Sequence, residues 1–322
     1  MKKLKPFLKV IIPLTIGFFF IYLMARSTSL EDKKQIFQYI KNADFRFIIL
    51  SVLFGVMSHL SRAYRWKFLL APLGYKPRFI NSTLAVLIAY IANLGIPRSG
   101  EILRATTLST YENIPFEKTF GTIITERLVD LIFLLGFILL ALSLQFDLIW
   151  QVIEEKKISL SSLIFTFLTV FLLFIILRHL FKYNQSKLIN KIIIFFKGLA
   201  EGVLSFKSMN NKVAFVLHTI FIWVMYVAMF YVIKWTVPET ESLGIVALLP
   251  AFVIGGLTIS ATNGGIGIYP FSVALMLSAF GISNESGLAF GWIVWTSQTL
   301  MIIVFGSLSF FVLPLVNRKI NF

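Results

Sequence analysis

The sequence predicts an all-α polytopic membrane protein, and its composition, its mean hydropathy and the spacing of its apolar stretches all point to this fold class. Of its 322 residues, 57% are hydrophobic and 14% are charged, whereas a soluble domain has about 25% charged residues. The mean hydropathy is +0.85, and a soluble fold of this length could not keep so much apolar surface away from water. A soluble enzyme, a soluble DNA-binding protein and a disordered chain are therefore excluded.

Six apolar stretches approach the roughly 20 residues that cross a bilayer as a helix. The first runs from Val10 to Ala25 after a lysine-rich start. We interpret it as a retained helix, because no clean signal-peptide cleavage site follows Met24. The other five predicted spans are residues 47–61, 119–146, 158–177, 213–233 and 287–313.

Two further regions look like pairs of half-length helices joined by a break. In residues 80–110 the break is Pro97-Arg98-Ser99-Gly100-Glu101, and in residues 243–281 it is Thr262-Asn263-Gly264-Gly265-Ile266-Gly267. Non-helical backbone at membrane depth is tolerated only where protein buries it or where it lines a wet cavity. We therefore predict two re-entrant helical hairpins.

The distribution of basic residues predicts the orientation. Two thirds of the 30 Lys and Arg residues fall on one side of this arrangement, which the positive-inside rule assigns to the cytoplasm together with both chain termini. We expect one multi-pass domain in the cytoplasmic membrane over residues 1–322, with halves 1–146 and 158–322 of opposite orientation. Inverted repeats with broken helices are a transporter architecture, and two unrelated kinked helices are the alternative.

The first break carries the strongest candidate site, which we assign to a lipid headgroup or phosphate. Arg98 lies near the predicted N-terminus of a half-helix, where free backbone N–H groups favour an anion, and Arg suits bidentate phosphate contact. Gly100 allows close backbone approach. Glu101 and Arg104 stand three residues apart on one helix face, where they can pair. The alternative is an Arg–Glu network that only holds the hairpin together.

A second candidate cluster, Glu126, Arg127 and Asp130, lies on a long apolar helix. Charged residues at the centre of a membrane helix cost roughly 2.5–3.5 kcal/mol each on insertion scales, so these three require partners. Their spacing places a stripe of charge on one face, and Arg98 or Arg104 is the expected partner. We predict an intramembrane ion network here, with a proton or substrate relay as a further role.

The third candidate is the glycine-rich turn at Asn263, Gly264, Gly265 and Gly267. Such a turn at the start of a helix offers backbone N–H groups to an anion. It is not a phosphate-binding P-loop, because no Gly-Lys-Ser/Thr follows it. A packing role for the glycines is equally compatible with the sequence.

Three other segments are interpreted as contacts with the membrane surface. Arg62, Arg65, Trp66 and Lys67 are typical of an anchor at the membrane interface. Residues 186–207 form a basic amphipathic stretch that suits a helix on the inner leaflet, and a plain connecting helix fits it equally. Residues 30–45 are a similar, weaker case on the outer side.

Much catalytic chemistry is missing from the sequence. The chain has no cysteine, so disulfides, thiolate nucleophiles and iron–sulfur clusters are excluded. Its histidines, His59, His179 and His218, have no metal-ligand spacing. There is no Asp-x-Asp pair, no Gly-x-Ser-x-Gly motif and no His-Glu-x-x-His motif. We therefore expect no catalytic residue, metal or cofactor, and a transporter more than an enzyme.

Several of these residues together resemble a known family. Pro97-Arg98-Ser99-Gly100-Glu101 with Arg104, followed by Glu126-Arg127 and Asp130, is similar to the membrane region of lysylphosphatidylglycerol synthases, a family of flippase-like membrane proteins. Some relatives are loosely named dolichol-phosphate-glucose synthetases. Arg62-Ala63-Tyr64-Arg65-Trp66 and the late glycine turn also resemble family landmarks, although Ser260 to Asn263 stand where relatives often have Pro-Gly.

The resemblance implies movement of an aminoacylated or glycosylated phospholipid between leaflets. We expect a lipid translocase whose cargo is a membrane phospholipid or a polyprenyl-linked lipid, without nucleic acid and without an ATP motif. A homo-oligomer and a lipid-modifying enzyme partner stay open. The alternatives are a membrane-embedded lipid-linked glycosyl or aminoacyl transferase component, or a membrane scaffold for a partner enzyme.

Overall fold

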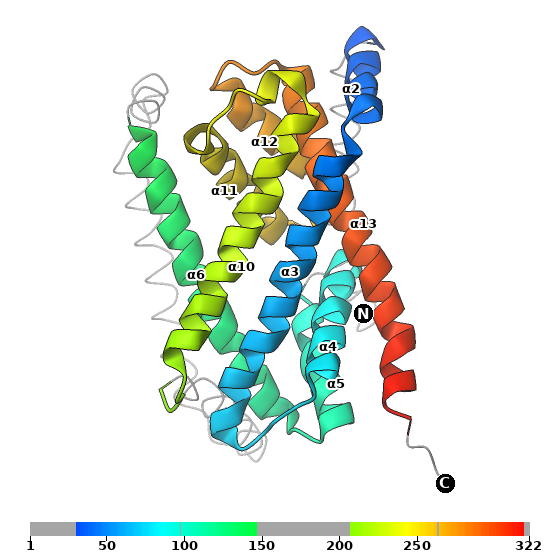
Figure 1. Ribbon diagram of the computed structural model, residues 1–322, viewed down its shortest axis with the longest axis vertical. Helices are drawn as coiled ribbons and strands as arrows, with labels where there is room; N and C mark the ends of the chain where they lie inside the picture. Colours follow the sequence, from blue (N-terminus) through cyan, green and yellow to red (C-terminus); the bar gives the residue numbers. More distant parts are fainter. Residues whose placement is uncertain (1–29, 97, 147–206, 263, 319–322) are drawn as a thin grey trace, which may run out of the picture.

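Four long helices dominate the computed structural model, which describes residues 30–96, 98–146, 207–262 and 264–318 (Figure 1). All regular structure in these ranges is helical. The helices long and apolar enough to cross a membrane are α3 (Phe45–Leu70), α6 (Phe116–Leu144), α10 (Lys212–Tyr231) and α13 (Asn284–Val316). They confirm four of the predicted spans and an integral membrane protein. The predicted spans 10–25 and 158–177, and the amphipathic stretch 186–207, lie almost entirely outside the described residues.

Short 3₁₀ turns extend two of these helices. Turn η1 (Ala71–Leu73) follows α3, and η2 (Val232–Thr236) follows α10. Asp44 caps α3 by accepting a hydrogen bond from the backbone N–H of Arg46, and Ser283 caps α13 in the same way through Ser286. These side chains occupy backbone donors that would otherwise be left unpaired at a helix start.

The two broken segments form helical hairpins. The first consists of α4 (Phe79–Gly95) and α5 (Gly100–Glu112), and the second of α11 (Ile245–Ala261) and α12 (Ile268–Ser278). Figure 1 shows them at opposite ends of the long helices, with α4 and α5 in the lower half and α11 and α12 in the upper half. The chain breaks therefore lie where the sequence predicts them.

The turns of the two hairpins approach each other. A Cβ on Gly264, in the second turn, would lie 2.8 Å from Leu94 at the end of α4. Helix α13 runs along both hairpins. Its Gly306 packs on Ile91 of α4, and its Gly291 packs on Pro270 of α12. Small residues allow this close helix packing without a hydrophobic driving force in lipid.

Among the described residues, the largest apolar core lies around α11, α12 and α13. Its buried members include Phe230, Ile233, Val273, Leu277 and Phe290. A smaller core fills the space between α3, the first hairpin and α6, and it includes Trp66, Ala85, Leu108 and Ile123. The two cores occupy opposite halves of the molecule, one beside each hairpin.

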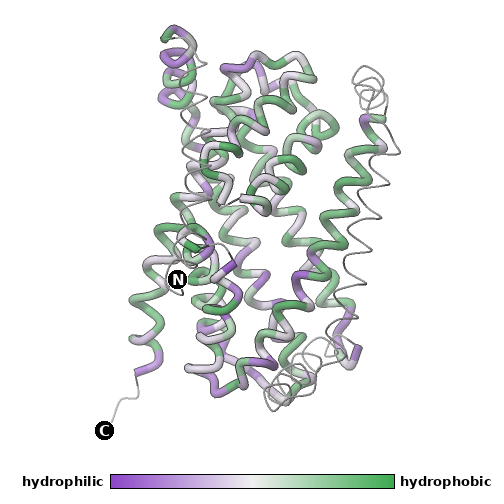
Figure 2. Tube along the Cα trace, turned by 180° about the vertical axis from the view of Figure 1, so that it is seen from behind, coloured by the Kyte–Doolittle hydropathy of each residue, from purple (hydrophilic) through white to green (hydrophobic). Residues whose placement is uncertain are grey.

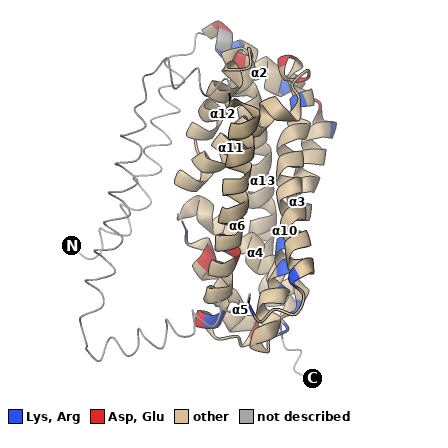
Figure 3. Cartoon of the chain, turned by 90° about the vertical axis from the view of Figure 1, so that its left-hand side faces the viewer, with Lys and Arg blue, Asp and Glu red and all other residues tan. Residues whose placement is uncertain are grey.

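Polar segments lie mainly at the two ends of the helices. Helix α2 (Leu30–Asn42), the amphipathic segment predicted on the outer side, and the short turn η3 (Pro238–Thr240) lie at one end. Figure 2 shows hydrophobic residues along the long helices, and Figure 3 shows charged residues toward both ends of the described bundle. A smaller set of charges lies within the lower half, and this set forms the candidate site.

Candidate functional site

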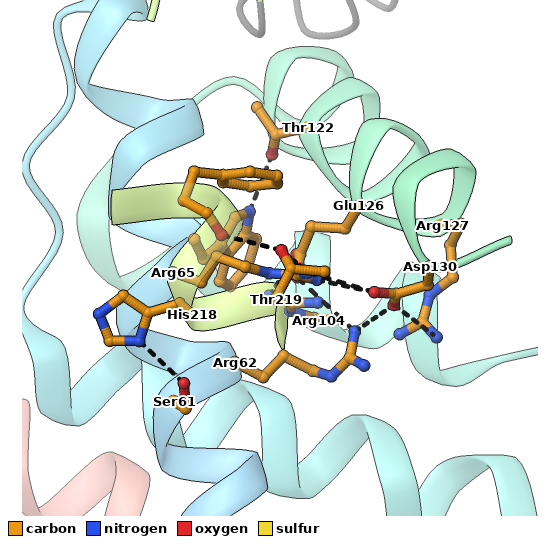
Figure 4. Close-up of polar contacts among 12 residues, drawn as sticks. Ser61, Arg62, Arg65, Arg104, Thr122, Glu126, Arg127, Asp130, His218 and Thr219 are labelled. Atoms are coloured by element: carbon orange, nitrogen blue, oxygen red, sulfur yellow. Dashed lines mark hydrogen bonds and ion pairs between the residues drawn. The ribbon is translucent and has the colours of Figure 1, made fainter. Parts of the chain in front are cut away.

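The candidate site is a buried group of charges where α3, α5 and α6 meet. We define the ion cluster as Arg62, Arg65, Arg104, Glu126 and Asp130. Each of these residues is at most 8% exposed. Figure 4 shows their side chains converging from the different helices.

Helix α3 supplies two arginines to the carboxylates of α6. Arg62 Nη1 lies 2.6 Å from Asp130 Oδ2, and Arg65 Nη2 lies 2.9 Å from Glu126 Oε1 and 3.1 Å from Asp130 Oδ1. Arg62 and Arg65 are three residues apart and therefore share a helix face. Glu126 and Asp130 are four apart and share a face of α6 for the same reason. The arginine pair and the carboxylate pair thus meet as two matched stripes.

Helix α5 supplies the third arginine. Arg104 Nη2 lies 2.7 Å from Glu126 Oε2, and its guanidinium lies over the ring of Trp66 at 3.8 Å from the centroid. Trp66 Nε1 donates a hydrogen bond to Thr122 Oγ1 at 2.8 Å. Cation–π contact stabilises a desolvated arginine, so Trp66 both packs the core and holds Arg104 in place.

Neutral side chains from α4 and α10 complete the surroundings. Arg65 donates to Thr219 Oγ1 at 2.7 Å, and Arg62 donates to the hydroxyl of Tyr226 at 3.3 Å. The Tyr226 hydroxyl lies 3.0 Å from that of Tyr90 on α4. The cluster therefore links α3, α4, α5, α6 and α10, which are separate in sequence.

A small cavity borders the cluster between α3, the first hairpin and α6. Its enclosed volume is about 10 Å³, and it is lined by Arg62, Val86, Ala89, Tyr90, Asn93, Glu101, Arg104 and Arg127. Arg127 is the most exposed of its charged residues, with 44% of its side chain accessible, followed by Glu101 with 24%. Arg127 Nε lies 3.7 Å from Glu101 Oε1. These two residues form the accessible rim, and Arg62 and Arg104 form the buried wall.

The site carries an excess of positive charge. Its arginines are Arg62, Arg65, Arg104 and Arg127, and its carboxylates are Glu101, Glu126 and Asp130. Within the described residues the site therefore has four cationic and three anionic side chains. An excess charge in a low-dielectric interior attracts a counter-ion strongly.

Some donors at the cavity wall have no hydrogen-bond partner within the described residues. These donors are the Nε–H groups of Arg62 and Arg104, and the acceptor Glu101 Oε2 on the same cavity is likewise buried without a hydrogen-bond partner in the part of the chain that the structure describes. Leaving a buried donor unpaired costs about 1–3 kcal/mol, more if it is charged. A bound anion would satisfy such donors.

The structure brings most of the predicted site residues together. Glu101, Arg104, Glu126, Arg127 and Asp130 all belong to the ion cluster or its rim, and Arg104 is a partner of Glu126, as the sequence predicts. The expected pairing of Glu101 with Arg104 is replaced by a contact between Glu101 and Arg127. Arg104 is buried against Glu126 of α6, whereas Glu101, one turn earlier on α5, is partly accessible at the rim.

Arg98 lies elsewhere. It is exposed in the turn between α4 and α5, has a φ of 61° and is not among the residues that line the cavity. Gly100 has a packing contact, since a Cβ there would overlap the carbonyl oxygen of Ala89. Its backbone N–H donates to Asn93 Oδ1 at 2.7 Å. That donor at the start of α5 is thus used within the hairpin.

The glycine-rich turn has mostly internal contacts. Gly264, Gly265 and Gly267 have φ values of 67°, 77° and 73°, a region that glycine enters at little cost. The carbonyl of Gly264 accepts from Trp295 Nε1 at 2.7 Å, and the N–H of Gly265 donates to Thr262 Oγ1 at 3.0 Å. These contacts favour the packing interpretation. Asn263 lies outside the described residues.

Sequence reasoning misplaced the arginines of α3. Arg62, Arg65 and Trp66 were predicted as an interface anchor, and this is wrong, because all three are at most 2% exposed and lie in the core. The Arg62–Arg65 spacing carries the available signal, since two arginines on one face of a membrane helix need partners. No group of three or more His, Asp and Glu residues suited to a metal occurs in the described ranges.

Comparison with known proteins identifies the family. The family model described as the lysylphosphatidylglycerol synthase TM region matches residues 10–306. The chain belongs to this family. The matched range contains both hairpins and every charged residue of the site, and the resemblance to the lysylphosphatidylglycerol synthase TM family drawn from the sequence is confirmed.

Two curated relatives are similar to this family member. The UPF0104 membrane protein MJ1595 of Methanocaldococcus jannaschii is 24% identical over 299 residues, which cover 85% of this chain and 86% of the relative. The glycosyltransferase AglD of Haloferax volcanii is 28% identical over 114 residues, which cover 35% of this chain and 18% of that protein. No solved structure matches this chain.

Proposed function

We propose that the protein is a lipid translocase that moves an anionic phospholipid, or another lipid with a phosphate-bearing headgroup, between the leaflets of the cytoplasmic membrane. The observation that carries this proposal is the excess positive charge of the ion cluster beside a cavity between membrane helices. Ionisable groups within a membrane are expensive and mark substrate paths by default. Family membership supports the same class of protein.

The chemistry of the cavity wall suits a phosphate. Arg62, Arg104 and Arg127 present guanidinium groups to one space, and guanidinium binds phosphate oxygens through paired N–H groups. Tyr90 and Asn93 add polar groups at the same wall. The acyl chains would remain in the lipid while the headgroup crosses through the protein.

The size of the cavity implies a closed state. Its enclosed volume of about 10 Å³ is far below the roughly 300–1,000 Å³ of small-molecule sites and is about the space of one water molecule, so a headgroup phosphate enters only after the walls separate. The wall is a hairpin in which α4 ends at Gly95 and α5 begins at Gly100. In our proposal this hairpin moves away from α6 to admit the headgroup, and the Arg127–Glu101 contact at the rim separates.

The test is leaflet exchange in reconstituted vesicles. Phosphatidylglycerol with a fluorescent label is followed by quenching of the outer leaflet, with labelled phosphatidylethanolamine in parallel. We expect Arg127→Gln to slow exchange of phosphatidylglycerol by about tenfold, as the loss of ~1.4 kcal/mol of stabilisation does. Arg127 is at the rim, so its loss leaves the buried ion pairs intact.

Arg98→Gln is the matched control. It removes the same charge from an exposed position outside the cavity lining, and exchange should stay near the wild-type rate. If Arg127→Gln and the wild type exchange phosphatidylglycerol at equal rates, the assignment of this site is wrong. If the wild-type protein exchanges neither lipid between leaflets, the proposal of a translocase is wrong.

A second candidate function is lipid-linked glycosyl transfer, which the name of the relative from Haloferax volcanii suggests. The carboxylates that could act as a base or hold a metal, Glu126 and Asp130, are each held by two arginines at 3.2 Å or less. This pairing favours an anion site over transferase chemistry. Formation of labelled lipid from a nucleotide sugar and polyprenyl phosphate by pure protein would reverse that preference.

A further inference from the structure

A second concave feature is formed by residues of α3, α10 and the start of α4. We define the outer groove by its lining residues: Met57, Leu60, Ser61, Tyr64, Phe79, Leu217, His218 and Phe221. Its volume is about 510 Å³, within the roughly 300–1,000 Å³ range of small-molecule sites. It shares no residue with the cavity of the ion cluster.

The groove is open along its length. Leu217 is 60% exposed, Phe79 is 49% exposed, and Met57, Leu60, Tyr64 and Phe221 are between 36% and 43% exposed. Only Ser61, at 7%, is buried at its floor. These residues belong to helices that are long enough to cross the membrane, or to the start of α4, so the described part of the chain presents the groove to lipid.

The polarity of the groove changes from one end to the other. Toward the middle of the helices it is lined by Met57, Leu60 and Phe221. Toward the C-terminal end of α3 it has Tyr64 and His218, whose rings are 5.0 Å apart. Lys67 adds a cation at this end, with Nζ 3.3 Å from the centroid of the Tyr64 ring.

The polar end has a fixed hydrogen bond. Ser61 Oγ lies 2.8 Å from Nδ1 of His218 (Figure 4). This contact engages one ring nitrogen, so Nε2 of His218 is not used by Ser61. An imidazole nitrogen and an ammonium group at the head of an apolar groove suit the ester and phosphate region of a phospholipid.

We propose that the outer groove binds one anionic phospholipid of the membrane, with an acyl chain along Met57, Leu60 and Phe221 and its phosphate beside His218 and Lys67. The charge of Lys67 complements an anionic headgroup, and the apolar end lies deeper along the same helices, as the chain of an amphiphile requires. This second site does not depend on the translocase proposal.

The position of the groove connects it to the ion cluster through α10. His218 lines the groove, and the next residue, Thr219, accepts a hydrogen bond from Arg65. A lipid in the groove would therefore contact the same turn of α10 that holds Arg65. Binding would restrain this turn.

Photo-crosslinking tests the site in the full chain. The protein is reconstituted in phosphatidylcholine vesicles that contain a small fraction of phosphatidylglycerol with a diazirine on its acyl chain. We expect crosslinked peptides from α3 around Met57 to Tyr64 and from α10 around Leu217 to Phe221. Leu217→Trp fills the groove and should lower this yield by about tenfold, the effect of ~1.4 kcal/mol of lost binding free energy.

Leu308→Trp is the matched control, because Leu308 is a similarly exposed leucine, 53% accessible, on α13. It should leave the groove peptides labelled. Lys67→Gln should lower the yield of the phosphatidylglycerol probe and not that of a phosphatidylcholine probe. If Leu217→Trp does not fold, Met57→Phe takes its place.

Four results would overturn the proposal. The lipid site is wrong if the groove peptides are not labelled. It is also wrong if Leu217→Trp leaves their labelling unchanged. If the phosphatidylglycerol and phosphatidylcholine probes label the groove equally and Lys67→Gln changes neither yield, the preference for an anionic headgroup is wrong. A change of oligomeric state in Leu217→Trp, measured by light scattering in detergent, would assign the groove to contact between copies of the chain.

Discussion

Arg65 shows at the residue scale how a buried charge is accommodated. Its guanidinium contacts Glu126, Asp130 and the hydroxyl of Thr219, and it lies 5.0 Å from the centroid of the Phe215 ring. Desolvating one arginine costs several kcal/mol, and two carboxylates with a hydroxyl offset that cost. The side chain is therefore fixed by its partners and cannot be replaced alone.

Glu126 is the acidic centre of the same cluster. Its carboxylate contacts Arg65 at 2.9 Å and Arg104 at 2.7 Å. We expect Glu126→Gln to destabilise the protein by about 3–5 kcal/mol, because the buried Arg104 loses its carboxylate partner and the buried Arg65 keeps only Asp130. The measurement is the midpoint of thermal unfolding in detergent.

Glu101→Gln is the companion variant for that experiment. Glu101 is partly accessible and has its cation at 3.7 Å, so its loss should cost less than about 1 kcal/mol. If both variants lower the midpoint equally, the cluster does not stabilise the fold in the way its geometry indicates.

Helix boundaries show what sequence patterns determine at the scale of the element. Apolar stretches located α6, α10 and α13 to within a few residues, because an apolar run of this length is rare outside a membrane-spanning helix. The predicted span 47–61 ended too early, since α3 continues to Leu70. In the sequence, the polar residues from Arg62 onward look like the end of a membrane span. Their ion pairs with α6 place Arg62 and Arg65 inside the protein instead.

The first hairpin depends on close approach of its two helices. A Cβ at Gly100 would overlap the Ala89 carbonyl, a backbone atom of α4 that cannot turn aside. We expect Gly100→Ala to destabilise the hairpin by about 3 kcal/mol through overpacking. The yield of monodisperse protein and its unfolding midpoint in detergent measure the effect.

Gly256→Ala provides the comparison within a helix. A Cβ on Gly256 would meet nothing within 4 Å among the described residues, so alanine should be neutral or stabilising by up to about 1 kcal/mol. A Gly100→Ala variant that behaves like Gly256→Ala would show that α4 and α5 separate readily in the resting protein.

The arrangement of the whole molecule is compatible with the inverted organisation that the sequence predicts. One hairpin lies in each half of the bundle, and α13 packs along both (Figure 1). In that organisation the loop before α4 and the loop before α11 lie on opposite sides of the membrane. The orientation itself is a prediction from charge.

Cysteine labelling tests this orientation directly, because the chain has no native cysteine. Lys76 and Glu241 lie in the loops before α4 and α11 respectively, and both are exposed. In right-side-out vesicles we expect an impermeant maleimide to label Glu241→Cys and not Lys76→Cys, with the reverse in inverted vesicles. Labelling of both positions from one side would contradict the predicted topology.

The sequence by itself determined the membrane class, the four long spans, the two breaks and the identity of most charged site residues. Each of these follows from local composition, because a bilayer imposes length and polarity on every segment separately. Only the tertiary structure decided which charges pair: Arg62 and Arg65 joined the core, Glu101 turned to Arg127, and Arg98 stayed exposed. Pairing depends on contacts between helices distant in the chain, and local sequence does not carry that information.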